Sequence, residues 1–595
     1  MIRLVLILVA LAAATFAIIR MLGHHSLILL ALPVAGIVAL VVAVQFWRHT
    51  IGRRARIANR TRCLRWRIWL RLRPGPGWAS HLELIVRWSR LRAVLTGARS
   101  RPSMPGWRRL VTPATQYAVR LGRAQWFRRA WGRMEDQTLM LAPPRAGKTG
   151  YLCDRIIDHP GAVLATSTRA DALKLTIALR RQLGPAEVFN PQGVGGPEVR
   201  STVCFDLLSG CEDPALAMML GQALSGGVHT SGEGGDMAWW RGKAEDPLAA
   251  LLHAAALAGA TIEDVYAWTN RLGDDQVPAV LTRDPRAAKV WLSAIAEIRR
   301  QGKTPDSIRS TMSKALSWVA LPGLRDAVVP RTGARIFDPA AFAASTGTLY
   351  MIAAESGETS PVAPLFRALA ERIVWEGTLI GSRMPSGKLD PPMLLALDEV
   401  TQICPVPLPQ WLADSAGRGI VIIAVAHGIA QLEGRWGTQG AQAVWDTSGC
   451  KLLLGGLSDA DTLERVSQLC GEIELRRSGH DSRDLNRYVR VRVVPPELLR
   501  MLPDFRALVV RTNRYPAAIH LRMAWKRRDV RRSVSSAARS MGGWQPLPVL
   551  DLAELSSAVP DDLAVPDDLA ATAPLSAPPA SPPFIWKPRN PKGTR

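Results

Sequence analysis

The sequence has little from which a metal or disulfide framework could be built. Its 595 residues include only seven cysteines, which are scattered, odd in number and without a C-x-x-C pair. Neither a zinc site nor a disulfide scaffold is therefore indicated. No zinc finger, helix-turn-helix signature or RNA-binding motif is present, which argues against a protein that reads bases. Hydrophobic residues make up 48% of the chain, and this excludes a mainly disordered protein.

Acidic residues are also in short supply. The chain has 75 Lys and Arg against 50 Asp and Glu, which gives a formal net charge of +25. Such an excess suits a polyanionic partner, either nucleic acid or anionic lipid. The length predicts more than one domain.

Two apolar runs lie at the N-terminus, at residues 4–19 and 27–44, and ten arginines follow between residues 48 and 73. The second run is long enough to span a membrane, and the first becomes so when its flanks are included. Positive charge beside a span marks the cytoplasmic side. We therefore predict a transmembrane hairpin at 1–47, placing the protein in the cytoplasmic membrane as a multi-pass protein with its body inside. A cleaved signal peptide and a buried helical hairpin are the alternatives.

The basic, tryptophan-rich stretch 48–135 is predicted to be a juxtamembrane adaptor. Its arginines and tryptophans suit contact with anionic headgroups, and direct contact with DNA is the second interpretation.

A phosphate-binding loop is predicted after the apolar run 138–141. The next eight residues read Ala142-Pro-Pro-Arg-Ala-Gly-Lys-Thr149, one glycine short of G-x-x-x-x-G-K-[ST], in which backbone N–H groups wrap nucleotide phosphates. Lys148 is expected to meet the outer phosphates of ATP, and the Thr149 hydroxyl to bind Mg²⁺. The residues expected to wrap the phosphates are Ala142, Pro143, Pro144, Arg145, Ala146 and Gly147. A simple turn with a solvated lysine is the alternative.

A second motif supplies the carboxylates that such an ATPase needs. The apolar run 393–397 ends in Asp398 and Glu399; Asp398 is expected nearest the metal, and Glu399 is expected to polarise the attacking water. A helix start is the alternative for this pattern. Arg418, between two glycines, is either a trans-acting arginine finger or a turn residue in solvent. His427 stands where a phosphate sensor would sit, at the end of the next apolar run.

Short apolar runs alternate with helical patterns, which predicts an α/β fold with a parallel, doubly wound sheet. The candidate strands after the loop are 162–166, 349–352, 393–397, 420–425, 452–454 and 507–510. We predict a nucleotide-binding domain over 136–206 and 336–530, interrupted by an inserted all-helical domain at 207–335. Helix starts in the insertion are expected at Thr261 (a capping box), Asp284 and Thr304. The stretch 531–595, rich in proline and alanine, is predicted to be a disordered tail.

Several motifs in order resemble those of a known family. They are Lys148-Thr149, residues 163–171, Val188-Phe-Asn-Pro-Gln192, Leu397-Asp-Glu-Val400, Gly417-Arg-Gly-Ile420, Ile429-Ala-Gln-Leu432 and Leu454-Gly-Gly456. Over about 138–525 the chain resembles the type IV secretion coupling proteins, the TraG/TraD-type DNA-transfer ATPases of conjugation. It departs from them at Ala142, usually glycine, and at His427, usually glutamine.

The resemblance implies a membrane-anchored, RecA-like P-loop ATPase that uses ATP and Mg²⁺ and assembles as a homo-hexamer around a channel. Its partners would be single-stranded DNA, relaxase and relaxosome proteins, the type IV secretion channel and the lipids of the cytoplasmic membrane. A coupling ATPase for protein effectors and a non-hydrolysing membrane docking scaffold are the alternatives.

Overall fold

The computed structural model describes residues 75–124, 129–228, 235–271, 275–300, 302–354, 360–476 and 488–540. The predicted transmembrane hairpin, the arginine series and residues 541–595 of the predicted tail lie outside these residues. Residues 531–540 were predicted to belong to the disordered tail, but they are helical and form part of α21 (Arg528–Ser540), so this part of the prediction was wrong. Within the described ranges, no helix combines the length and the hydropathy needed to cross a bilayer. The chain divides into two units, residues 1–534 and 535–595, and the fold that follows is that of the first.

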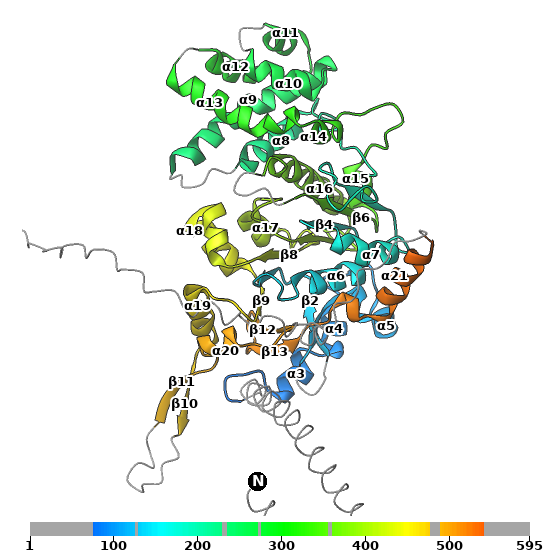
Figure 1. The fold of residues 1–595 in the computed structure, drawn as a ribbon, viewed down its shortest axis with the longest axis vertical. Helices are drawn as coiled ribbons and strands as arrows, with labels where there is room; N and C mark the ends of the chain where they lie inside the picture. The colour runs from blue at the N-terminus through cyan, green and yellow to red at the C-terminus, as the bar shows by residue number, and fades with distance from the viewer. Residues whose placement is uncertain are drawn as a thin grey trace, which may run out of the picture. The chain divides into compact units, whose positions relative to one another are not determined.

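One mixed sheet forms the centre of this unit (Figure 1). Its eleven strands have the order β2-β1-β13-β12-β9-β3-β8-β7-β4-β6-β5. They are β1 (Ala118–Arg123), β2 (Arg129–Arg133), β3 (Thr138–Leu141), β4 (Val163–Ser167), β5 (Ala186–Phe189), β6 (Thr348–Ile352), β7 (Met393–Leu397), β8 (Ile420–Ala426), β9 (Cys450–Leu454), β12 (Arg506–Arg511) and β13 (Ala517–His520).

The strands from β9 to β5 in this order are mutually parallel, and five of them confirm predicted strands. The predicted strand 507–510 is present as β12, but it pairs antiparallel with β9. Its expected parallel direction was therefore wrong. An apolar run reports burial on both faces of a sheet and carries no information about direction.

Helices cover both faces of the sheet because its strands are apolar on both sides. Along β4, Val163 and Ala165 pack with α6 (Lys148–Asp158) and α7 (Asp171–Arg180). Leu164, between them, packs with the opposite layer. That layer is formed by α16 (Ala363–Arg383), α17 (Leu408–Asp414) and α18 (Ile429–Thr447).

The described residues of the adaptor predicted for 48–135 do not form a separate domain. Three short helices, α3 (His81–Arg87), α4 (Arg90–Thr96) and α5 (Gly106–Val111), lead into β1 and β2, which join the central sheet. The 135/136 boundary is thus a correction to the sequence prediction. The β1–β2 register shifts between Arg120 and Gly122, and this irregularity hides the alternation that would identify β1 as a strand.

The predicted helical insertion 207–335 contains helices between β5 and β6, and a parallel bridge joins Cys204 to Ile336 at its base. The helices are α8 (Pro214–Gly227), α9 (Gly235–Ala258), α10 (Ile262–Asn270), α11 (Gln276–Arg283), α12 (Leu292–Arg299), α13 (Lys303–Leu316) and α14 (Pro322–Asp326); α15 (Pro339–Ala343) follows. Figure 1 shows α8–α13 on the far side of α16 from the sheet. The buried side chains of α8 and α16 belong to one hydrophobic cluster, so the insertion shares its core with the sheet.

The three helix starts predicted within this insertion were only partly confirmed. Thr261 begins α10 with a capping box, as predicted. Asp284 does not begin a helix: its N–H donates to Val280, so it ends α11, and the next α-helix begins at Leu292. The N-cap expected at Thr304 lies two residues earlier, at Gly302, and α13 begins at Lys303.

Candidate functional site

The loop after β3 has the strand–loop–helix arrangement expected of a phosphate loop. The Ala142 N–H donates to the carbonyl of Ala426 at 3.1 Å, which ties the start of the loop to the end of β8. The loop ends at Gly147, whose φ of +97° precedes the first turn of α6. A side chain at this position would also stand 3.0 Å from Phe505, so glycine is required for two reasons.

Alanine in place of the family's first glycine is accommodated. Ala142 is buried and lies outside the positive-φ region, which in this loop is occupied by Arg145 and Gly147. Of the other predicted loop residues, Pro144 and Arg145 are exposed, while Pro143, Ala146 and Thr149 are half-buried.

The structure brings the predicted lysine to the predicted acidic pair. The Lys148 ammonium lies 2.5 Å from Glu399 Oε1, although the two residues are 251 positions apart. His427 joins them: its Nδ1 lies 3.2 Å from Lys148 Nζ, and its Nε2 lies 3.2 Å from Glu399 Oε1. Topology explains this meeting, because β8 lies between β3 and β7 and all three parallel strands end at one edge.

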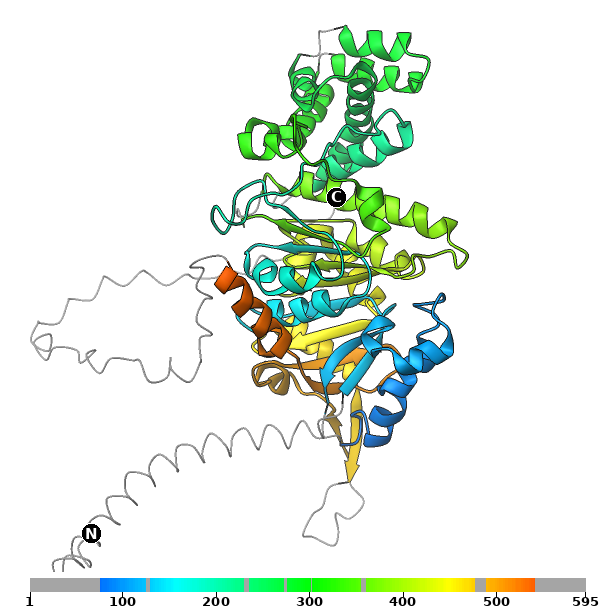
Figure 2. The same ribbon diagram turned by 90° about the vertical axis from the view of Figure 1, so that its right-hand side faces the viewer.

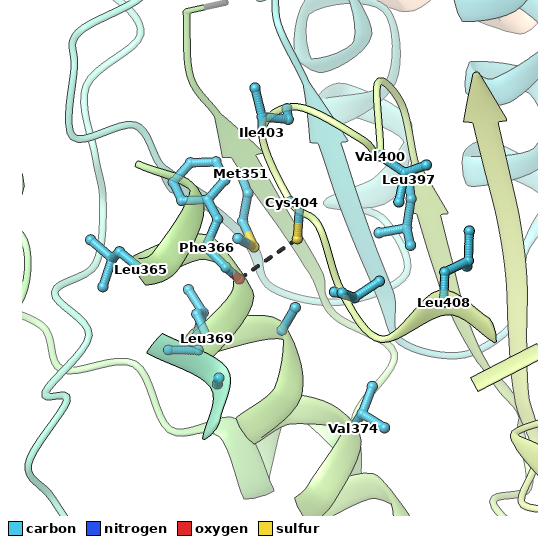
Figure 3. Close-up of a cluster of buried hydrophobic side chains, with 14 of the residues drawn as sticks. Met351, Leu365, Phe366, Leu369, Val374, Leu397, Val400, Ile403, Cys404 and Leu408 are labelled. Carbon is cyan, nitrogen blue, oxygen red and sulfur yellow. Dashed lines mark hydrogen bonds between the residues drawn. The ribbon is translucent and has the colours of Figure 1, made fainter. Parts of the chain in front are cut away.

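The acidic pair is held by the segment that follows it. Val400, Ile403, Cys404 and Leu408 are buried against α16, and the Cys404 thiol donates to the Phe366 carbonyl at 3.7 Å (Figure 3). Glu399 itself has a φ of +48°, a conformation that turns the chain immediately after the strand. The buried loop therefore fixes where the two carboxyl groups lie.

Some carboxyl oxygens of the acidic pair accept no hydrogen bond from the described residues. Asp398 Oδ1 and Glu399 Oε2 are buried and have no hydrogen-bond partner in the described part of the chain. The Asp398 backbone carbonyl, by contrast, accepts a hydrogen bond from the Thr166 hydroxyl at 3.0 Å. Unpaired buried carboxylate oxygens are costly, and a hard cation such as Mg²⁺ would satisfy them.

The two carboxyl groups differ in their acidity. Burial, reinforced by the neighbouring charge of Glu399, raises the pKa of Asp398 to about 6. Burial also acts to raise the pKa of Glu399, but hydrogen bonds from His427 and Lys148 outweigh it and hold this pKa below its ordinary value. The hydrogen bond to Glu399 raises the pKa of His427. Glu399 therefore ionises at a lower pH than Asp398.

Within one chain, Arg418 lies away from Lys148 and the acidic pair. It lies two residues before the start of β8, at the sheet edge opposite to Lys148, and forms an ion pair with Asp414 at 2.5 Å. Together with Trp375 and Trp411 it lines a hollow of about 480 Å³. The structure thus does not join Arg418 to the site within one chain, and its action on a neighbouring subunit stays a prediction.

Sequence reasoning missed several residues that shape the site. The Gln431 side chain accepts a hydrogen bond from the His427 N–H at 2.9 Å; it lies within a quoted motif, but no role was assigned to it. Phe505 and Trp525 pack against Gly147 and Gly150 at the start of α6. They are far from the loop in sequence, and no motif marks them.

Part of the chain matches a known family model. Residues 392–504, which include Asp398, Glu399 and His427, match the family model described as the TraM recognition site of TraD and TraG. No curated protein sequence matches the chain.

Solved structures extend the comparison to the fold. The structure is similar to the unbound monoclinic form of the bacterial conjugative coupling protein TrwBdeltaN70, with a TM-score of 0.52, 17% identity, and coverage of 68% of this chain and 88% of that one. The plasmid coupling protein TrwB in complex with ADP and Mg²⁺ gives a TM-score of 0.46 at 16% identity, covering 66% and 86%.

The mixed α/β fold is thus shared with a conjugative coupling protein. The family model and this fold together confirm the predicted resemblance to the type IV coupling proteins.

Proposed function

We propose that this protein is a membrane-anchored ATPase that couples ATP hydrolysis to the recruitment of relaxase-bound single-stranded DNA and its transfer into a type IV secretion channel. One observation carries the proposal: the phosphate loop and the acidic pair meet at the carboxyl edge of the sheet, where Lys148 contacts Glu399. Ligands of open α/β sheets bind at this edge.

The side chains of the site suit ATP and Mg²⁺. The N–H groups of the loop and of the first turn of α6 would bind the phosphates, and Thr149 and Asp398 would supply oxygen ligands for the metal. When bound, Mg²⁺-ATP supplies the phosphoryl group to be transferred and neutralises part of its charge. With nucleotide bound, Lys148 would contact the outer phosphates in place of Glu399, and Glu399, ionised at neutral pH, would then be free to orient water. His427 bridges the loop and Glu399.

The net charge of the chain and its resemblance to the coupling proteins support the proposed cargo and assembly. A net charge of +25 without any base-reading motif suits contacts to the phosphates of single-stranded DNA that do not depend on sequence. The matched family model, whose description names TraM recognition, supports a relaxosome partner. A homo-hexamer in the cytoplasmic membrane completes the proposal, with Arg418 supplied to a neighbouring subunit's nucleotide.

Turnover of ATP by the purified chain tests the proposal. Lys148→Ala should lower turnover at least about 100-fold, because the lysine stabilises charge on the transferred phosphoryl group. Lys303→Ala, at the start of α13 in the helical insertion, should leave it unchanged. Single-stranded DNA should stimulate the wild type. A wild type without any turnover would indicate a scaffold, and turnover that ignores DNA would indicate protein cargo.

A further inference from the structure

Three consecutive short helices expose large apolar side chains to the surroundings. In α3, α4 and α5 the exposed fractions range from 42% for Ile85 to 73% for Val111. The full set, which we term the α3–α5 apolar surface, comprises Leu82, Ile85, Val86, Leu91, Leu95, Trp107, Leu110 and Val111. Isolated exposed apolar residues are ordinary, but a concentration of this kind within 30 residues marks an interaction site.

The exposed residues follow helical spacing on each helix. Leu82 and Val86 are four residues apart on α3, as are Leu91 and Leu95 on α4, so each pair lies on one side of its helix. The same helices also bury side chains in the fold, Leu84 on α3 and Ala93 on α4. A helix at a protein surface normally has one apolar side, so α3 and α4 each have a second apolar side that the fold leaves uncovered.

The helices are held firmly in place. The Arg90 guanidinium on α4 donates to the carbonyls of Leu110 and Thr112, at 3.0 and 3.1 Å, and so fixes the end of α5. The Trp88 carbonyl accepts from the Trp131 N–H of β2 at 2.9 Å. Figure 2 shows these helices, in blue, together along one flank of the β1–β2 end. The α3–α5 apolar surface is therefore tied to the strand β2 of the central sheet.

The positive charge of this segment favours anionic lipid as the partner of the α3–α5 apolar surface. Residues 75–111 contain seven arginines and a single acidic residue, Glu83. Arg101 is paired with Asp390 of the body, whereas Arg87, Arg92, Arg99 and Arg108 are exposed. The Arg108 guanidinium lies over the exposed Trp107 ring, 5.2 Å from its centroid. Apolar side chains interleaved with arginine suit the boundary between the headgroups and acyl chains of anionic lipid. A second copy that met this surface with its own α3–α5 apolar surface would present the same positive charge and would be repelled.

The position of α3–α5 in the chain also favours the membrane as the partner of this surface. The helices begin a few residues after the ten arginines at 48–73, which themselves follow the two apolar runs. Gly77 packs against Val493 and Ile473, so the described chain already contacts the body just before α3 begins.

We propose that the α3–α5 apolar surface rests on the anionic cytoplasmic leaflet, with its apolar side chains among the upper acyl chains and its arginines at lipid phosphates. The inference rests on the proposed membrane anchor and deepens it, because it fixes which flank of the sheet faces the bilayer.

Fluorophore labelling tests the contact on the full-length chain reconstituted in vesicles. A cysteine introduced at Leu95 carries an environment-sensitive dye, and quenching by nitroxide-labelled lipid is measured in vesicles of phosphatidylcholine and phosphatidylglycerol. Val290→Cys is the matched control, since Val290 is 76% exposed but lies in the helical insertion. The chain without an introduced cysteine corrects for label on native thiols. Quenching at position 95 should exceed that at 290 about fivefold, and equal quenching would overturn the inference.

The remaining outcomes separate this inference from the proposed anchor. In phosphatidylcholine alone, quenching at position 95 should fall, because the arginines lose their anionic partners. Protection of the dye in detergent, rising with protein concentration, would show that a second copy covers the surface and would overturn the inference. If the anchor is wrong, the chain should still bind phosphatidylglycerol vesicles added from outside, and Leu91→Glu with Leu95→Glu should abolish this binding. A chain that binds in neither preparation contradicts both.

Discussion

Asp398 combines deep burial with a neighbouring carboxylate, and this combination sets how the site responds to pH. Its pKa of about 6 means that the carboxyl group is protonated below this pH in the nucleotide-free protein. A metal ligand must be deprotonated. Affinity for Mg²⁺-ATP should therefore rise as the pH increases through 6 and level off above it, with a loss of about tenfold between pH 7 and pH 5.

Titration of a fluorescent ATP analogue at each pH measures this dependence. His427, whose pKa lies above its ordinary value, gains positive charge as the pH falls, which favours nucleotide and opposes the effect of Asp398. A His427→Gln background removes that contribution. In this background, Asp398→Asn should bind weakly at every pH; a persisting pH dependence would assign it to another group.

Glu399 should matter for turnover more than for binding. Its carboxylate holds Lys148 in the nucleotide-free site, so Glu399→Gln should release the lysine and leave nucleotide affinity unchanged or slightly higher. Turnover should fall at least about 100-fold, since a neutral amide orients water poorly and accepts no proton. Phosphate release measured beside analogue binding checks both, with Glu497→Gln, an exposed glutamate of α20 (Pro496–Arg500), as the control. A parallel loss of binding and turnover would instead assign Glu399 a role in holding the nucleotide.

The residues of the site that could be predicted are those that motifs mark. Lys148, Asp398, Glu399 and His427 were identified because each follows an apolar strand whose carboxyl end the α/β pattern places at one edge. Phe505 could not be identified in this way, because its proximity to Gly147 arises from the return of the chain through the antiparallel strands, which the sequence pattern does not specify.

At the scale of elements, α6 has Lys148 at one end and a buried ion-pair network at the other. Asp154 of α6, which is fully buried, lies 2.7 Å from Arg527, and Arg527 also contacts Asp158 at 2.7 Å. Arg155 and Arg522 make further contacts with this aspartate pair. The network joins the helix of the phosphate loop to the start of α21 (Arg528–Ser540).

Arg527→Ala should destabilise the fold through this network. It leaves buried carboxylates with fewer partners, and the free energy of unfolding should fall by about 2 kcal/mol, less than for a fully isolated buried charge because Arg155 and Arg522 remain. Urea unfolding followed by tryptophan fluorescence measures the change. Arg528→Ala, at the next and exposed position, should change it by less than about 0.5 kcal/mol. Equal effects of the two substitutions would contradict the role given to the network.

Elements were predictable in proportion to how continuous their apolar runs are. β7 and β8 are apolar throughout and were identified with nearly the correct bounds. β5 contains Glu187 within only four residues, and β1 carries Arg120 beside an irregularity, so neither stands out from a loop. Asp284-Pro285 resembles a helix start, yet tertiary packing extends α11 to it, which local propensity cannot foresee.

At the scale of the whole molecule, the helical insertion and the sheet form one body. Alternation of apolar runs and helical patterns located the insertion between strands, but it could not show that α8 packs on α16 within the same hydrophobic cluster. A movement of the insertion would therefore be transmitted directly to α16, against which the segment after Asp398 and Glu399 is buried. This contact is a physical route by which cargo at the insertion and nucleotide at the sheet could influence each other.

The net charge of +25 makes a quantitative prediction for DNA binding by the whole chain. A protein that neutralises about six phosphates of a single strand should lose about 300-fold in affinity between about 50 and about 200 mM salt, because each contact releases a condensed counterion. Fluorescence anisotropy of labelled single strands of unrelated sequence measures both the slope and the lack of base preference. Lys148→Ala should leave this slope unchanged, since the lysine faces Glu399 and the nucleotide. An affinity that is flat with salt, or one that differs widely between sequences, would show that the cargo is not held through its phosphates.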